Sequence, residues 1–132
     1  MPLQKECCSL EIARQLKTLG FEQSSLYYYV KLLGVFSIFP AKDSHILSSI
    51  PEKEFNSACK SKISAFTSSE LGEMLPWKIK DFDIITQKTT DGKWFIYQRP
   101  FLTNKVVNLK VEDTEADARA KMLIYLKTSN LI

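Results

Sequence analysis

The side chains that most often carry chemistry are scarce in this sequence. His45 is the single histidine, and Cys7, Cys8 and Cys59 show neither the CxxC nor the HxxxH spacing of zinc or redox sites. A catalytic histidine needs a partner that orients it or takes its proton, and the sequence around His45 suggests none. We therefore interpret His45 as a surface-loop residue and the cysteines as reduced, buried or half-buried thiols, and we expect no metal and no cofactor.

Motifs of enzyme active sites are also missing from the sequence. It contains no GxSxG, no P-loop and no GxGxxG, and its four glycines do not cluster as phosphate-binding loops require. No pair of carboxylates stands in a context typical of acid–base catalysis. The sequence thus favours a protein that is not an enzyme.

Aromatic and arginine side chains are the remaining candidates for a binding site. In a strand, Tyr27 and Tyr29 would share one face, and Phe95 and Tyr97 would do the same in a later strand. Each pair is either half core and half surface, or a platform for a partner or a base. The net charge of +3 and the scattered lysines do not favour nucleic acid.

Two arginines are candidate donors to an anionic ligand. Arg99 ends the strand that carries Phe95 and Tyr97. Arg119 falls inside the apolar arc of the last helix, where it either extends along the edge of that arc beside Glu115 or lies buried against a carboxylate or phosphate. The candidate site residues are Tyr27, Tyr29, Phe95, Tyr97, Arg99 and Arg119.

The elements that position these residues can be predicted from hydrophobic spacing and end signals. A helix is expected from a cap at Ser9 to Gly20, followed by strands over 26–32 and 35–39, with Gly34 marking either a turn or a bulge. The segment 41–65 is the least regular. We expect a short strand at 45–47 and a helix over 52–59 within it.

The second half of the chain has sharper signals. Thr67 and Glu70 form a capping box for a helix that Pro76 ends. Asp91-Gly92 predicts a tight hairpin between strands over 84–90 and 93–99, and 105–111 reads as a third strand.

The last helix has signals at both ends. Thr114 is its expected cap, Asn130 can take the left-handed position after its end, and Leu131 can fold back on the last turn. Acid-first i,i+4 pairs are expected for Glu115–Arg119 and Asp117–Lys121. Its apolar stripe predicts a lid on the core of one α+β domain (1–132), an antiparallel sheet of four or five strands with a hairpin at 91–92, packed by the N- and C-terminal helices.

The stretches FTSSELGEMLPW, the DGKW hairpin and EADARAKMLIYL resemble a group of small proteins encoded by phages, prophages and other bacterial mobile elements. The resemblance covers about residues 66–132 and the LxxLGF end of the first helix. It implies an accessory gene product in a bacterial host cell and transfers no catalytic residue. A cytoplasmic location also agrees with the lack of a signal-peptide pattern and of an apolar run of membrane-spanning length.

Together these features predict a non-enzymatic accessory protein that binds a macromolecular partner, either a host protein or a second copy of itself. The alternative is a small-ligand binder, such as a protein that sequesters a nucleotide signal of host defence. That alternative requires aromatic side chains and cations around one pocket, with Arg99 and Arg119 as the best donors.

Overall fold

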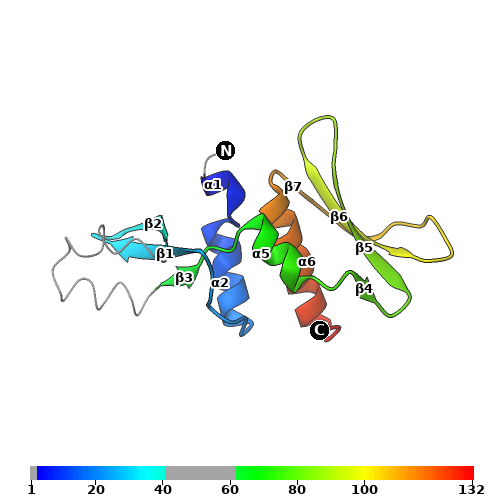
Figure 1. Ribbon diagram of the computed structural model, residues 1–132, viewed down its shortest axis with the longest axis horizontal. Coiled ribbons are helices and arrows are strands. Elements are labelled where there is room, and N and C mark those ends of the chain that lie inside the picture. The colour runs from blue at the N-terminus through cyan, green and yellow to red at the C-terminus, as the bar shows by residue number, and fades with distance from the viewer. Residues whose placement is uncertain (1–2, 41–61) are drawn as a thin grey trace.

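The computed structural model describes residues 3–40 and 62–132, which form two antiparallel sheets with helices between them (Figure 1). The elements are α1 (Leu3–Glu6), α2 (Leu10–Thr18), β1 (Tyr27–Leu32), β2 (Val35–Pro40), β3 (Ile63–Ser64), α5 (Ser68–Met74), β4 (Lys78–Ile79), β5 (Phe82–Lys88), β6 (Trp94–Pro100), β7 (Val107–Glu112) and α6 (Glu115–Thr128).

The strands divide between a three-stranded sheet of order β2-β1-β3 and a four-stranded sheet of order β4-β5-β6-β7. The α+β class and the packing of helices against sheet are confirmed. The single sheet expected from the sequence is instead two sheets, because α5 lies between β3 and β4 and carries the chain from one sheet to the other (Figure 1). The expected strand at 45–47 and helix over 52–59, with His45 and Cys59, fall outside the described residues.

Two hairpins form, with different turns, and one of them joins the two strands predicted on either side of Gly34. Leu33 and Gly34 make a two-residue turn in which both residues have positive φ, 52° and 83°. The β5–β6 hairpin is confirmed, but its turn is longer than the tight two-residue one expected. The Gly92 N–H donates to the Thr89 carbonyl at 3.1 Å, the Thr89 N–H donates to the Lys93 carbonyl at 2.9 Å, and Gly92 alone takes positive φ. This is the three-residue loop with a glycine bulge.

Most helix ends follow the sequence. Thr67 and Glu70 form the expected capping box, and Thr114 accepts from the Asp117 N–H at 3.2 Å. After α6, Asn130 has φ 57° and the Leu131 N–H donates to the Leu126 carbonyl at 2.8 Å. This 6→1 bond closes the last turn as predicted.

Two predicted contacts near the helix starts are wrong. The Ser9 side chain makes no capping bond; instead its backbone N–H donates to the Asp117 carboxylate at 2.7 Å. Lys121 pairs with Glu112 rather than with Asp117. A side-chain partner on another element thus replaces the local one, and Asp117 joins α6 to the start of α2.

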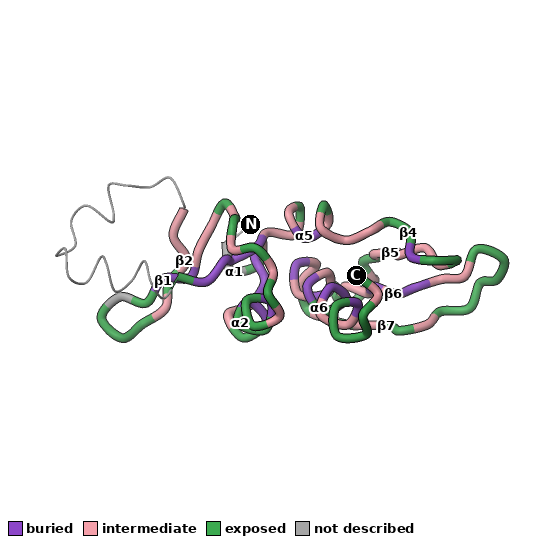
Figure 2. The backbone as a smooth tube through the Cα atoms, turned by 90° about the horizontal axis from the view of Figure 1, so that it is seen from below, coloured by how far each residue is buried: buried purple, intermediate pink, exposed green. Residues whose placement is uncertain are grey.

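Helix α6 does not cover a single core, as predicted, but lies between two cores and packs into both. Ala116, Ala120 and Leu123 pack into the core of α2, α5 and the three-stranded sheet. Met122 and Leu126 belong to a second core with the four-stranded sheet. Figure 2 shows α6 between the two ends of the molecule, with buried residues recurring along the helix among intermediate and exposed ones. Its apolar residues thus occupy two sides of the helix, not one stripe.

Candidate binding surfaces

The structure distributes the six predicted site residues over three places. Phe95, Tyr97 and Arg99 lie on one face of β6, whereas Ile96 on the opposite face is fully buried beside α6. Tyr27 and Tyr29 pack in or against the first core. Arg119 lies between α5 and α6. The sequence therefore grouped residues that the fold separates.

The face of the four-stranded sheet turned away from α6 is here called the outer face. In register, Tyr97 pairs with Ile85, and Phe95 lies between Gln87 and Val111. Val111 is 42% exposed. The apolar centre of this face consists of Ile85, Phe95, Tyr97 and Val111.

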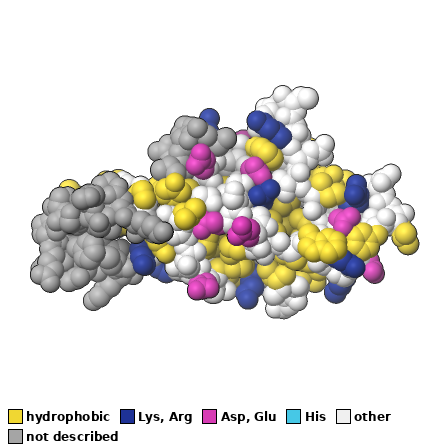
Figure 3. All heavy atoms as spheres, viewed as in Figure 1, with side chains coloured by type: hydrophobic (Ala, Val, Ile, Leu, Met, Phe, Trp, Pro, Cys, Tyr) yellow, Lys and Arg dark blue, Asp and Glu magenta, His cyan; other side chains and the backbone are white. Residues whose placement is uncertain are grey.

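Two cations and one anion lie at the end of the outer face. An Arg99 guanidinium nitrogen lies 3.8 Å from an Asp83 carboxylate oxygen, and the Lys78 ammonium lies 5.0 Å from the Phe101 ring centroid. In Figure 3, hydrophobic side chains lie at the surface over the four-stranded sheet, with single basic and acidic side chains between them. The outer face is therefore aromatic and apolar without a dense cationic cluster.

Tyr29 is a core residue and not part of a surface platform. Its hydroxyl donates to the Cys8 carbonyl at 2.8 Å, and burial raises the pKa of that hydroxyl above its usual range. Tyr27 is half-buried against the same core. The alternation that predicted a shared face is correct, but that face points inward.

Arg119 lies beside Glu115 at the edge of the apolar arc, the first of the two arrangements predicted for it. Its guanidinium donates to the Ser68 carbonyl at 2.7 Å and pairs with the Glu115 carboxylate at 2.6 Å. A Cβ on Gly72 would lie 2.5 Å from an Arg119 nitrogen, so the glycine makes room for the guanidinium. Because Arg99 is on the outer face and Arg119 lies between two helices, the predicted two-arginine ligand pocket does not form.

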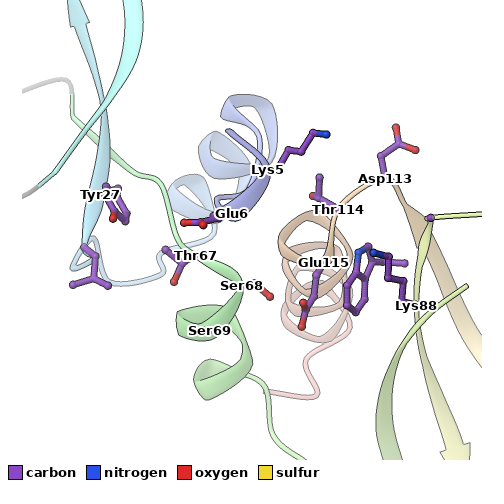
Figure 4. A pocket seen from close by; sticks show the side chains of 13 residues that line it. Lys5, Glu6, Tyr27, Thr67, Ser68, Ser69, Lys88, Asp113, Thr114 and Glu115 are labelled. Atoms are coloured by element: carbon purple, nitrogen blue, oxygen red, sulfur yellow. The ribbon is translucent and has the colours of Figure 1, made fainter. Parts of the chain in front are cut away.

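A groove of about 840 Å³, which the sequence did not predict, lies between the starts of α5 and α6. Figure 4 shows Thr67, Ser68 and Ser69 on one wall and Thr114 and Glu115 on the other, with Lys88 beyond Glu115. Trp94 also lines the groove. Tyr27 lies on the side away from Lys88 (Figure 4), and Leu26 is a further lining residue. The two capping threonines are visible in the sequence, but their approach depends on tertiary packing.

The described thiols are unsuited to nucleophilic work. Cys7 and Cys8 are free and buried. Burial, helped by nearby Glu70 and Glu6, raises the pKa of the Cys7 thiol to about 11. Burial, with Asp117 adding to it, raises that of Cys8 to about 12. Both thiols therefore stay protonated at neutral pH.

The described residues contain no cluster of three or more histidine, cysteine, aspartate or glutamate side chains placed to hold a metal ion. None of the helices within 3–40 and 62–132 has the length and apolar character needed to cross a membrane. Comparisons of the chain with protein-family models, curated proteins and solved structures find no match.

Proposed function

We propose that this protein is a non-enzymatic binding module that contacts another protein through the outer face of its four-stranded sheet. The observation that carries the proposal is the apolar, aromatic face that α6 leaves uncovered. An antiparallel sheet commonly buries one face and exposes polar residues on the other. Here Phe95, Tyr97 and Val111 stand where polar side chains would be expected.

The composition of the face fits a protein partner. Tyrosine and arginine are enriched among residues that dominate protein–protein binding energy, and Tyr97 and Arg99 are neighbours on this face. Nucleic acid is disfavoured because the face has no dense cationic cluster: Arg99 is paired with Asp83, and Lys78 is a single ammonium group beside them. The resemblance to mobile-element proteins makes a bacterial host protein the preferred partner, encountered in the host cytoplasm.

Affinity capture from a bacterial lysate tests this proposal when it is coupled to a variant of the face. The protein with both Tyr97→Ser and Val111→Ser should lose a partner that the unchanged protein captures. Leu33→Ser is the matched control, because Leu33 is 85% exposed on the β1–β2 turn, away from the outer face. Binding should then be repeated with the purified partner by calorimetry.

Two results would count against the proposal. Capture that is equal for the unchanged protein and the double variant, with both shown to be folded by circular dichroism, would place the contact elsewhere. A concentration-dependent dimer in analytical ultracentrifugation that the double variant abolishes would assign the face to a second copy of the chain instead.

A further inference from the structure

The groove between the starts of α5 and α6 contains several polar groups whose interactions are already complete. The Glu115 carboxylate is paired with Arg119 at 2.6 Å, and the Asp113 carboxylate with Lys93 at 2.9 Å. The Thr67 hydroxyl is engaged with Glu70 in the capping box. These groups hold the walls together and have little capacity left for a ligand.

The groups that remain are mostly hydrogen-bond donors. The Ser68 hydroxyl oxygen is buried without a hydrogen-bond partner, and Figure 4 shows it directed from α5 toward α6. Lys5 and Lys88 border the groove, and neither forms an ion pair with another described residue. Glu6 is the one lining carboxylate without such a pair in the described chain. The groove therefore has two unpaired ammonium groups against one unpaired carboxylate.

An unpartnered buried hydroxyl is costly, typically about 1–3 kcal/mol, and a ligand that accepts a hydrogen bond from it would remove that cost. The groove volume of about 840 Å³ lies within the range of small-molecule sites. Leu26 and Trp94 are among its lining residues and supply apolar surface. A ligand with acceptor oxygens, negative charge and an apolar portion matches these three features.

We infer that the groove binds a small phosphomonoester that carries a planar or apolar group. Its phosphate, with a charge of about −1.5 to −2 at neutral pH, would accept from the Ser68 hydroxyl and from a lysine at the rim. This site uses none of the outer-face residues. Ligand binding in the groove is therefore independent of partner binding at the outer face.

Titration followed by amide NMR tests the inference directly at this molecular size. The probes are adenosine 5′-monophosphate, adenosine and inorganic phosphate, each at up to millimolar concentration. The monophosphate should shift the amides of Ser68, Ser69, Gly92 and Glu115, which line the groove. Adenosine should bind at least about tenfold more weakly, because it lacks the charged acceptor.

Variants separate a ligand site from a structural effect. Lys88→Gln and Ser68→Ala should each weaken binding of the monophosphate about tenfold, because each removes roughly one charge-assisted hydrogen bond. Ser68→Ala should leave the melting temperature unchanged or raise it, because an unpartnered hydroxyl is removed. Lys127→Gln is the charge-matched control at the other end of α6, where its ammonium lies near Phe21.

Several outcomes would overturn the inference. These are no amide shift with any phosphate-bearing probe, equal affinity for adenosine and its monophosphate, or shifts that map outside the groove. Binding that Lys88→Gln and Lys127→Gln weaken equally would also overturn it, because that result would show general charge attraction only. Shifts with inorganic phosphate alone would support the phosphate contact and reject the planar group.

Discussion

At the scale of single residues, Leu33 is in a backbone conformation that is unfavourable for its type. It has φ 52° in the β1–β2 turn, and its side chain is 85% exposed, so no packing offsets the strain. A left-handed conformation costs a residue with a Cβ roughly 1–2 kcal/mol, whereas asparagine tolerates it. Leu33→Asn should therefore raise the free energy of unfolding by about 1 kcal/mol in urea titrations.

The control for Leu33 is Leu102, which is 96% exposed without positive φ. Leu102→Asn should change the unfolding free energy by less than about 0.5 kcal/mol. Equal gains at both positions would show that lost surface hydrophobicity, and not turn geometry, is responsible.

The buried thiols predict a loss of stability at alkaline pH. The pKa of Cys7 rises from 9.0 to about 11, and that of Cys8 from 9.0 to about 12. A raised folded-state pKa gives stability that is complete below the unfolded value and declines as pH rises through the folded one. The unfolding free energy should fall from about pH 9 upward, with Tyr29 contributing in the same direction.

Urea unfolding between about pH 8 and pH 11 measures this effect. The double variant Cys7→Ala, Cys8→Ala should lose less stability over that interval, although it starts from a lower value. An identical pH dependence in both proteins would mean that folding does not raise the pKa of these thiols.

At the scale of elements, α5 and α6 are fitted together by Gly72 and Arg119. In an exposed helix, glycine to alanine adds about 1 kcal/mol of stability. Here the new methyl would displace a guanidinium that is bonded to Ser68 and Glu115. Gly72→Ala should thus stabilise the protein only when Arg119→Ala is also present. A double-mutant cycle in urea measures the coupling, and additive effects would contradict it.

The two buried sides of α6 give a second prediction for an element. Leu123 and Met122 are both fully buried, in different cores. Replacing either by alanine should lower the unfolding free energy by about 2–5 kcal/mol. Lys127→Ala on the exposed last turn is the control and should have little effect. A small cost at Met122 alone would restore the interpretation of α6 as a one-sided lid.

At the scale of the whole molecule, a shared α6 should make the two sheets unfold together. Leu71 lies in the first core and Ile96 in the second. Leu71→Ala should lower the hydrogen-exchange protection of the Ile96 amide as much as it lowers the protection of amides in the first core. Deleting residues 120–132 should abolish cooperative melting, because it removes buried side chains from both cores. Separate transitions for the two sheets, or a cooperative melt after the deletion, would show that they are independent.

The sequence by itself determined the local structure. The capping box at Thr67, the hairpin around Gly92, and the end of α6 at Asn130 depend on backbone conformation and hydrogen bonds within a few residues. The partners in these three cases are only a few residues apart in the chain, so no distant segment is needed to supply them. Strand alternation likewise placed Phe95 and Tyr97 on one face.

Tertiary structure decided what those local elements face. The Asp117 carboxylate accepts a hydrogen bond from the Ser9 N–H, 108 positions away. Tyr29 points into a core, and the groove forms only where the starts of α5 and α6 meet. Residue spacing predicts which side of a helix or strand is apolar, but not whether that side meets one layer or two, because this depends on contacts between distant segments. The sequence therefore predicted α6 as a lid, and packing made it the wall between two cores.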